Sequence, residues 1–233
     1  VDSDGIVRRG LLFLDDGTNF FQSFSWLLAL QYLKQEGIVP KPAGGNPDWV
    51  ELGQTVFRPF ESYDGSYMGA DSQGYQFLLD LERRENLFPT IEFGALLAGD
   101  FRPELVQDHI VLIGVVAQGV KDYFITSQCG SLSTCPPIPG IELHGYMVTQ
   151  LLRSAKGESQ KPISTFSELH ETGWIGLWIL GGGVIGAWVR GAWRFSLALL
   201  MGMVLLGGVV VTGMMYGRWI PFIPPLLGWM INA

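Results

Sequence analysis

The sequence predicts an α/β domain, with a mixed sheet and flanking helices, followed by α-helical membrane segments. The first observation behind this prediction is the distribution of charge. Residues 1–173 contain 12 Lys and Arg and all 22 Asp and Glu, whereas residues 174–233 contain three Arg and no acidic residue. The second is that strand-like and helix-like patterns alternate in the first part, while long uncharged runs fill the second. We therefore treat the two parts separately.

The first part carries a net charge of −10. A surface of this sign repels nucleic acid and anionic headgroups, so we expect no nucleic-acid partner. A segment of this length can bury a core of its own. We therefore expect a globular domain over residues 1–160 and a juxtamembrane linker over residues 161–172.

Hydrophobic periodicity predicts the elements of this domain. Strands are expected at residues 6–14, 55–60 and 110–116, and helices at residues 23–36, 90–99 and 141–155. The helix at 23–36 has Ser23 or Ser25 to cap its start and Gly37 to end it. Its apolar residues, expected to pack on the core, are Phe24, Leu27, Leu28, Leu30 and Leu33.

Two other segments of the domain have informative composition. Residues 40–48 contain three Pro and two Gly and are expected to form a surface loop. Residues 110–116 are the most apolar short run outside the membrane segments. Such a run is typical of a fully buried strand in a parallel sheet.

Three apolar runs follow the domain. Residues 173–189 and 195–216 are uncharged except at their flanks and long enough to cross a bilayer. Residues 219–233 begin a third apolar run, with three prolines in its first turns, and we expect this helix to be truncated. The sequence starts at Val1 without a signal peptide, so we expect truncation at that end also.

The loop between the first two runs sets the expected orientation. It carries Arg190 and Arg194 and no acidic residue, which places it in the cytoplasm by the positive-inside tendency. Residues 1–172 are then extracytoplasmic. No ionisable residue lies in the middle of either complete run, so a transporter or channel is disfavoured.

Glycine pairs at four-residue spacing occur in these runs: Gly182 with Gly186, and Gly213 with Gly217. Such pairs allow helices to pack closely, within one chain or in a homodimer. A Gly-rich helix also produces this spacing by chance, and the spacing alone does not decide between the two.

Several motifs in the expected order resemble one known family. They are the opening 2–9 (DSDGIVRR), the run 109–122 (HIVLIGVVAQGVKD), the segment 139–144 (PGIELH) with its helix, and the membrane-entry run 219–225 (WIPFIPP). Together they resemble CHASE2 sensory domains, of which the chain contains the C-terminal portion. Compared with a full member, we expect the N-terminal anchor, the first part of the domain and the output domain to be missing from this sequence.

The resemblance implies an extracytoplasmic, signal-sensing module of a bacterial multi-pass plasma-membrane receptor. Three membrane helices would relay the signal to a cytoplasmic output domain absent from this chain, a kinase of a two-component or Ser/Thr type or a nucleotide cyclase such as adenylate cyclase. The chain itself is then not an enzyme and needs no cofactor. Alternative hypotheses are a membrane-tethered extracytoplasmic hydrolase and a structural dimerisation module.

A candidate ligand-binding surface follows the expected buried strand. Ligands tend to bind at the carboxyl ends of strands in open α/β sheets. The residues expected there are Lys121, Asp122, Tyr123, Glu142 and His144. A structural ion pair between Lys121 and Asp122 is the alternative, and His144 could also titrate near neutral pH.

Other chemistry is poorly supported. Gly114, Gly119 and Lys121 depart from a phosphate-binding loop, because Val120 separates the second Gly from Lys and Asp122 occupies the hydroxyl position. No metal site is expected, since Glu142 and His144 are two residues apart rather than three or four. No nucleophile elbow frames any serine.

The two cysteines, Cys129 and Cys135, lie in a loop rich in Gly, Ser and Pro on the side expected to be oxidising. We expect a disulfide between them; a metal pair is the alternative, but the loop offers no other good ligand.

Overall fold

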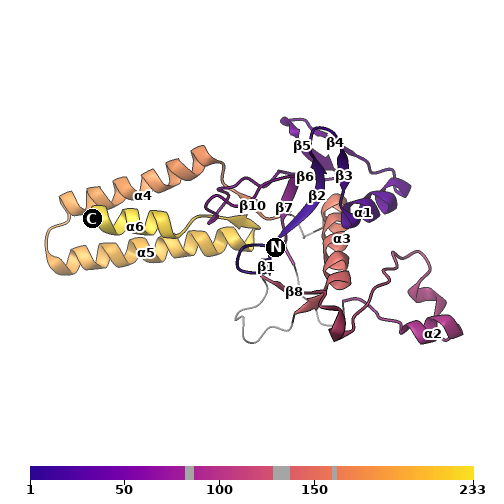
Figure 1. Cartoon of the computed structure of the whole chain (residues 1–233). Coiled ribbons are helices and arrows are strands. Elements are labelled where there is room, and N and C mark those ends of the chain that lie inside the picture. Colours follow the sequence, from indigo (N-terminus) through magenta and orange to yellow (C-terminus); the bar gives the residue numbers. More distant parts are fainter. Residues whose placement is uncertain (82–86, 128–136, 159–161) are drawn as a thin grey trace. The chain divides into compact units, whose positions relative to one another are not determined.

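The computed structural model describes residues 1–81, 87–127, 137–158 and 162–233. The chain divides into two compact units. Unit 1 comprises residues 1–60 and 72–162, and unit 2 comprises residues 61–71 and 163–233. Figure 1 shows the helices and strands of the chain, coloured along the sequence.

Unit 1 is built from short strands and three α-helices among its described residues. Its strands are β1 (Ile6–Val7), β2 (Arg9–Asp15), β3 (Phe20–Gln22), β4 (Pro40–Ala43), β5 (Asn46–Leu52), β6 (Thr55–Phe57), β7 (Tyr75–Leu78), β8 (Tyr123–Thr126) and β9 (Ile138–Pro139). Its α-helices are α1 (Phe24–Gln35), α2 (Phe93–Ala98) and α3 (Gly140–Lys156). The predicted α/β class is thereby confirmed, but the strands form several small sheets.

Three sheets have the orders β3-β2-β7, β4-β5-β6 and β1-β8-β9. The first two are antiparallel, whereas β1 pairs with β8 in parallel and β8 with β9 antiparallel. Helices α1 and α3 lie side by side next to these strands (Figure 1). The core of unit 1 includes Trp26 of α1, Phe57 of β6, Phe77 of β7 and Leu151 of α3.

Several predicted elements are confirmed. The helix expected at 23–36 is α1, and the Ser23 side chain caps it by accepting from the amide of Trp26 at 3.2 Å. The helix expected at 141–155 is α3, which ends where Gly157 takes a left-handed conformation. The strand expected at 55–60 is β6, and it lies at an edge of its sheet as Pro59 suggested.

The buried face of α1 differs from the expected one. Ser25, Trp26, Ala29 and Leu33 are buried, whereas Phe24 and Leu27 are each 48 % exposed. The large Trp26 determines which side of the helix faces the core, and α1 is apolar around much of its circumference, so composition alone did not identify this face.

The prediction of a surface loop at residues 40–48 is wrong. This segment is largely a hairpin, in which β4 and β5 pair through Gly44 and Gly45. Pro40 and Pro42 are compatible with a strand here because β4 is an edge strand, where a missing amide donor disrupts no inner ladder.

The prediction of a buried strand at residues 110–116 is also wrong. The segment has no strand assignment, and Val111, Ile113, Val115 and Val116 are 48 to 71 % exposed. A parallel strand becomes buried only when strands flank it and helices cover it. Among the described residues, no strand pairs with this segment.

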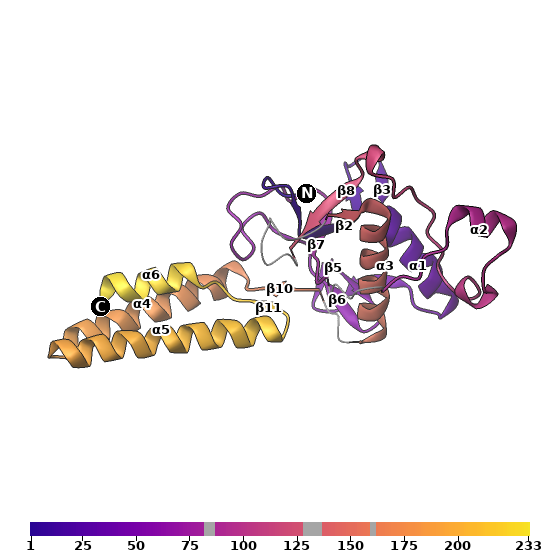
Figure 2. The same ribbon diagram turned by 90° about the horizontal axis from the view of Figure 1, so that it is seen from below.

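Unit 2 consists of three helices and a two-stranded parallel ribbon, with residues 61–71 packed into it. The helices are α4 (Glu168–Trp188), α5 (Ala192–Met215) and α6 (Ile223–Asn232), and the strands are β10 (Ser164–Thr165) and β11 (Arg218–Trp219). The three helices run alongside one another in two perpendicular views (Figure 2). Helices α4 and α5 include all but the last residue of the expected membrane runs 173–189 and 195–216. Helix α6 covers only residues 223–232 of the expected run 219–233, which begins in β11.

One helix within the described part of the chain, α5, is long and apolar enough to cross a membrane. Helix α4 begins with Glu168 and Glu171 and is rich in Gly and Trp, which lowers its mean hydropathy. Helix α6 has ten residues. The membrane crossings of α4 and α6 therefore stay predictions.

Aromatic rings and glycines interlock in this helical bundle. Trp174, Trp178 and Trp229 form a ladder, with ring centroids 5.6 and 5.4 Å apart. A Cβ added to Gly182 would lie 2.5 Å from the carbonyl oxygen of Trp229, and one added to Gly202 would clash with the Trp229 ring. These glycines therefore let α6 approach α4 and α5 closely.

The other paired glycines divide between two roles. A Cβ on Gly186 would meet the backbone of Ala233, and one on Gly213 would meet Ile220. Gly217, in contrast, has a φ of 69° and no atom within 4 Å of such a Cβ. The packing role expected for Gly217 is corrected to a turn role, since a left-handed conformation after α5 favours glycine.

Candidate functional site

The expected ligand-binding residues gather around the start of α3. The amide of Gly140 donates to the Asp122 carbonyl at 2.9 Å. A Cβ on Gly140 would lie only 2.5 Å from the carboxylate of Asp122, so a larger residue at this position would displace the Asp122 side chain. The exposed Asp122 carboxylate therefore sits beside a helix N-terminus, where negative charge is favoured.

His144 connects α3 to α1. Its Nδ1 lies 2.8 Å from the Ser25 hydroxyl, and its ring meets that of Phe24 edge-on at 5.2 Å. Burial lowers the pKa of His144, and the negative charge of Asp122 opposes this shift. The structure thus places Asp122 within electrostatic reach of a partly buried histidine, as the expected site requires.

The Ser25 hydroxyl has two hydrogen-bonding choices. It can donate to His144 Nδ1, or accept from a protonated Nδ1 while donating to Met147 Sδ at 3.7 Å. The hydrogen bond between Ser25 and His144 can therefore form in either protonation state, although burial disfavours the charged ring.

The remaining expected residues are arranged less favourably. Tyr123 donates its hydroxyl to the Val116 carbonyl, and Glu142 accepts a 3.4 Å hydrogen bond from Tyr146. Lys121 is exposed and takes a left-handed conformation with a φ of 55°. Asp122 and His144 are thus brought together, while Tyr123 and Glu142 have local structural partners.

Catalysis and metal binding find little support in this geometry. In the described part of the chain, Ser25 contacts His144 and Ser167 contacts His170. Ser25 is only 2 % exposed and cannot meet a substrate as a nucleophile. Among the described residues, no group of three His, Cys, Asp or Glu could hold a metal ion. Cys129 and Cys135 lie outside the described residues, so their disulfide stays a prediction.

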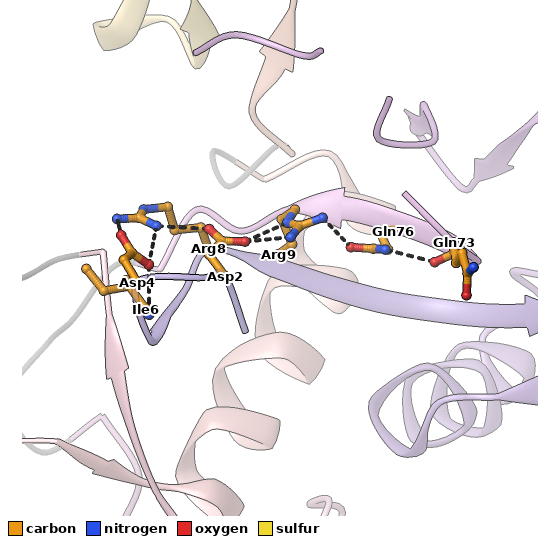
Figure 3. Close-up of polar contacts among 7 residues, drawn as sticks. All are labelled: Asp2, Asp4, Ile6, Arg8, Arg9, Gln73 and Gln76. Carbon is orange, nitrogen blue, oxygen red and sulfur yellow. Dashed lines mark hydrogen bonds and ion pairs between the residues drawn. The ribbon is translucent and has the colours of Figure 1, made fainter. Parts of the chain in front are cut away.

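A second polar cluster, which was not predicted as a site from the sequence, surrounds Arg8 and Arg9 (Figure 3). Asp2 accepts from Arg8 at 2.9 Å and from Arg9 at 2.6 Å, and its side chain is 6 % exposed. Arg8 also pairs with Asp4 at 2.7 Å. The adjacent arginines, preceded by acidic residues two positions apart, were the available sequence signal.

This cluster continues along β2 and β7. Arg9 donates to the Gln76 side chain at 2.9 Å, and Gln76 donates to the Gln73 carbonyl at 2.8 Å (Figure 3). The Arg9 guanidinium also lies over the Phe60 ring, 4.5 Å from its centroid. We call Asp2, Arg9, Phe60, Gln73 and Gln76 the Arg9 network.

The model of the CHASE2 domain matches residues 1–184. The chain belongs to the CHASE2 family. The resemblance noted from the motifs is thereby confirmed, and the matched region includes the Arg9 network, the Asp122 and His144 surface and most of α4. No curated protein and no solved structure shows significant similarity to the chain.

CHASE2 domains are extracellular sensory domains. Membership therefore supports a sensing role for this chain and an extracellular position for its sensory part. A sensory family is also consistent with the expectation that the chain is not an enzyme.

Proposed function

We propose that this CHASE2 chain is the extracytoplasmic sensing module of a bacterial multi-pass membrane receptor. The observation that carries the proposal is the family match over residues 1–184, which continues from the α/β unit into α4. A signal received outside would be relayed through α4, α5 and α6 to a cytoplasmic kinase or nucleotide cyclase.

The charges flanking the helices support this topology. Arg190 and Arg194 lie at the junction of α4 and α5, and no acidic residue accompanies them. Positive loops are retained in the cytoplasm, so the acidic unit 1 would lie on the opposite side. Three crossings would then leave the chain after α6 in the cytoplasm.

The start of α3 is the ligand-binding surface that we favour. Asp122 and Lys121 are exposed there, and His144 lies close enough to feel the charge of Asp122. Because His144 contacts Ser25 of α1, a ligand that displaces Asp122 or His144 would also alter the packing of α1 on α3.

Cysteine labelling in intact cells tests the topology. In a background with Cys129 and Cys135 replaced by Ser, single cysteines replace the exposed residues Val39 and Ala192. We expect a membrane-impermeant maleimide to label Val39→Cys in intact cells and Ala192→Cys only after permeabilisation.

Both cysteines must label in detergent-solubilised protein, which controls for local accessibility. The reversed pattern, with Ala192→Cys labelled from outside and Val39→Cys protected, would place unit 1 in the cytoplasm and overturn the proposal.

A further inference from the structure

Residues 61–71 leave unit 1 and return to it, yet they belong to the compact unit that contains the helices. We call residues 61–71 the strap. The chain therefore passes between the units at three points: where the strap begins, where it ends, and at the junction of residues 162 and 163.

Within unit 1, the Arg9 network binds the residues that flank both ends of the strap. At the start, the Phe60 amide donates to the Gln76 carbonyl at 2.8 Å, and Arg9 covers the Phe60 ring. At the return, Gln76 donates to the Gln73 carbonyl at 2.8 Å. A change in the position of Arg9 or Gln76 therefore acts on both ends together.

Within unit 2, Asp64 fastens the strap to β10. Its carboxylate accepts from the Thr165 hydroxyl at 2.6 Å and from the Glu61 amide at 2.8 Å, and the residue is only 6 % exposed. A buried carboxylate that accepts two such bonds is costly to release, because its charge would lose these partners.

The neighbouring strap residues contact β11. Gly65 has a φ of 63°, and a Cβ there would lie 2.8 Å from the Trp219 ring, so glycine is required on both counts. The ring of Tyr67 meets Trp219 edge-on at 5.9 Å. The strap thus contacts both strands of the β10–β11 ribbon, through Thr165 in β10 and Trp219 in β11.

This ribbon lies where the helices start. Strand β10 immediately precedes α4, and β11 joins the end of α5 to the start of α6. Burial raises the pKa of Glu171 in the first turn of α4, and the negative charge of Asp64 adds to this effect. Asp64 therefore acts electrostatically on the beginning of α4 as well as through Thr165.

We infer that the strap couples the Arg9 network to the starts of α4 and α6, with Asp64 as the residue that fastens it. This inference deepens the proposed relay by naming the segment that transmits the signal. The alternative is that the strap is held at both ends without transmitting anything, and the experiment below distinguishes the two.

Hydrogen exchange of the full chain in micelles, followed by mass spectrometry, measures the coupling. Gln76→Ala removes the side-chain hydrogen bonds of Gln76 with Arg9 and with the Gln73 carbonyl, next to the strap. It leaves the ion pair of Arg9 with Asp2 in place. We expect Gln76→Ala to speed exchange over residues 164–172 about tenfold, since local opening would spread through the strap. In an Asp64→Ala background, the same substitution should no longer change exchange there.

Thr165→Val removes the hydroxyl that donates to Asp64 and should reproduce the effect of Asp64→Ala. Met68→Ala is the matched control, because Met68 lies in the strap and is 91 % exposed. It should leave the response to Gln76→Ala intact.

An unchanged exchange rate over residues 164–172 in Gln76→Ala, or an equal effect with and without Asp64, would overturn the inference. If Gln76→Ala unfolds unit 1, Phe60→Leu offers a second perturbation, because it removes the ring that Arg9 covers directly before the strap. The exchange result does not depend on the side of the membrane, so its failure and that of the labelling experiment are distinguishable.

Discussion

His144 is the residue whose protonation state the structure constrains most clearly near neutral pH. Its pKa is lowered by burial, and Asp122 offsets this in part. In the unfolded chain it would titrate near its ordinary value of 6.5. The unfolded state therefore binds this proton more readily than the folded state does.

Acidification should consequently destabilise the packing of α1 on α3. The contribution of neutral His144 is complete above pH 6.5 and is lost as the pH falls through the lower folded-state pKa. We expect exchange protection of α1 and α3 to fall between pH 7.5 and 5.5. His144→Gln should flatten this dependence, while His109→Gln, at an exposed histidine, should leave it unchanged.

Tyr75 joins two sheets of unit 1 through its hydroxyl. The hydroxyl donates to the Phe57 carbonyl at 2.6 Å and accepts from the Val50 amide at 2.8 Å. Burial raises its pKa to about 12, because the charged form would be poorly solvated. The hydroxyl is therefore neutral at any physiological pH.

Removing this hydroxyl should be costly. Tyr75→Phe leaves a backbone donor and a backbone acceptor without their partner, and we expect a loss of about 1–3 kcal/mol in the stability of unit 1. Urea unfolding followed by exchange of β5 and β7 measures it. Tyr63→Phe, at a tyrosine that is 71 % exposed, should change stability little.

At the scale of elements, the helices were predicted well and the strands unevenly. Helices α1, α3 and α5 carry caps or long apolar runs, which are local signals. The burial of residues 110–116 depends on neighbouring strands, which no local pattern specifies. The hairpin of β4 and β5 was missed because proline was taken to exclude a strand, although edge strands tolerate it.

The candidate site was predicted in part for the same reason. Asp122 and His144 are close because Gly140 starts α3 beside Asp122, and the sequence places these residues on adjacent elements. The contact of His144 with Ser25 joins segments far apart in the chain. The contacts of Asp64 with Thr165 and of Arg9 with Gln76 likewise join segments far apart in the chain, so they could not be located from one sequence.

The packing of α4 against α6 gives a prediction about a single glycine. Gly182→Val would force a side chain against the Trp229 backbone, which cannot rotate away. We expect it to cost about 1–3 kcal/mol in the stability of unit 2, as overpacking typically does. Thermal unfolding in micelles, followed by near-ultraviolet circular dichroism, measures the change.

Gly208→Ala in α5 is the matched control, because nothing lies within 4 Å of a Cβ at that position. It should be neutral or slightly stabilising, since alanine favours the helix. Equal losses for the two variants would contradict the assignment of Gly182 to close packing.

At the scale of the whole molecule, the boundary in charge does not coincide with the boundary between the two compact units. The acidic residues lie before residue 174, and the apolar helices follow. The strap nevertheless takes its residues from the middle of the acidic part and contributes them to the helical unit. A division of the chain at residue 162 would therefore separate the strap from β10 and β11, which it contacts. Experiments on signalling consequently require the whole chain.

The ladder of Trp174, Trp178 and Trp229 also makes the helical bundle its own optical reporter. Indole rings this close exchange excitation energy, so their emission becomes depolarised while the ladder is intact. Any movement that slides α6 along α4 would separate Trp229 from Trp178 and raise the polarisation of the emission, while Trp174 and Trp178 stay paired on α4. A movement of α6 relative to α4 could thus be followed by fluorescence, without attaching a dye.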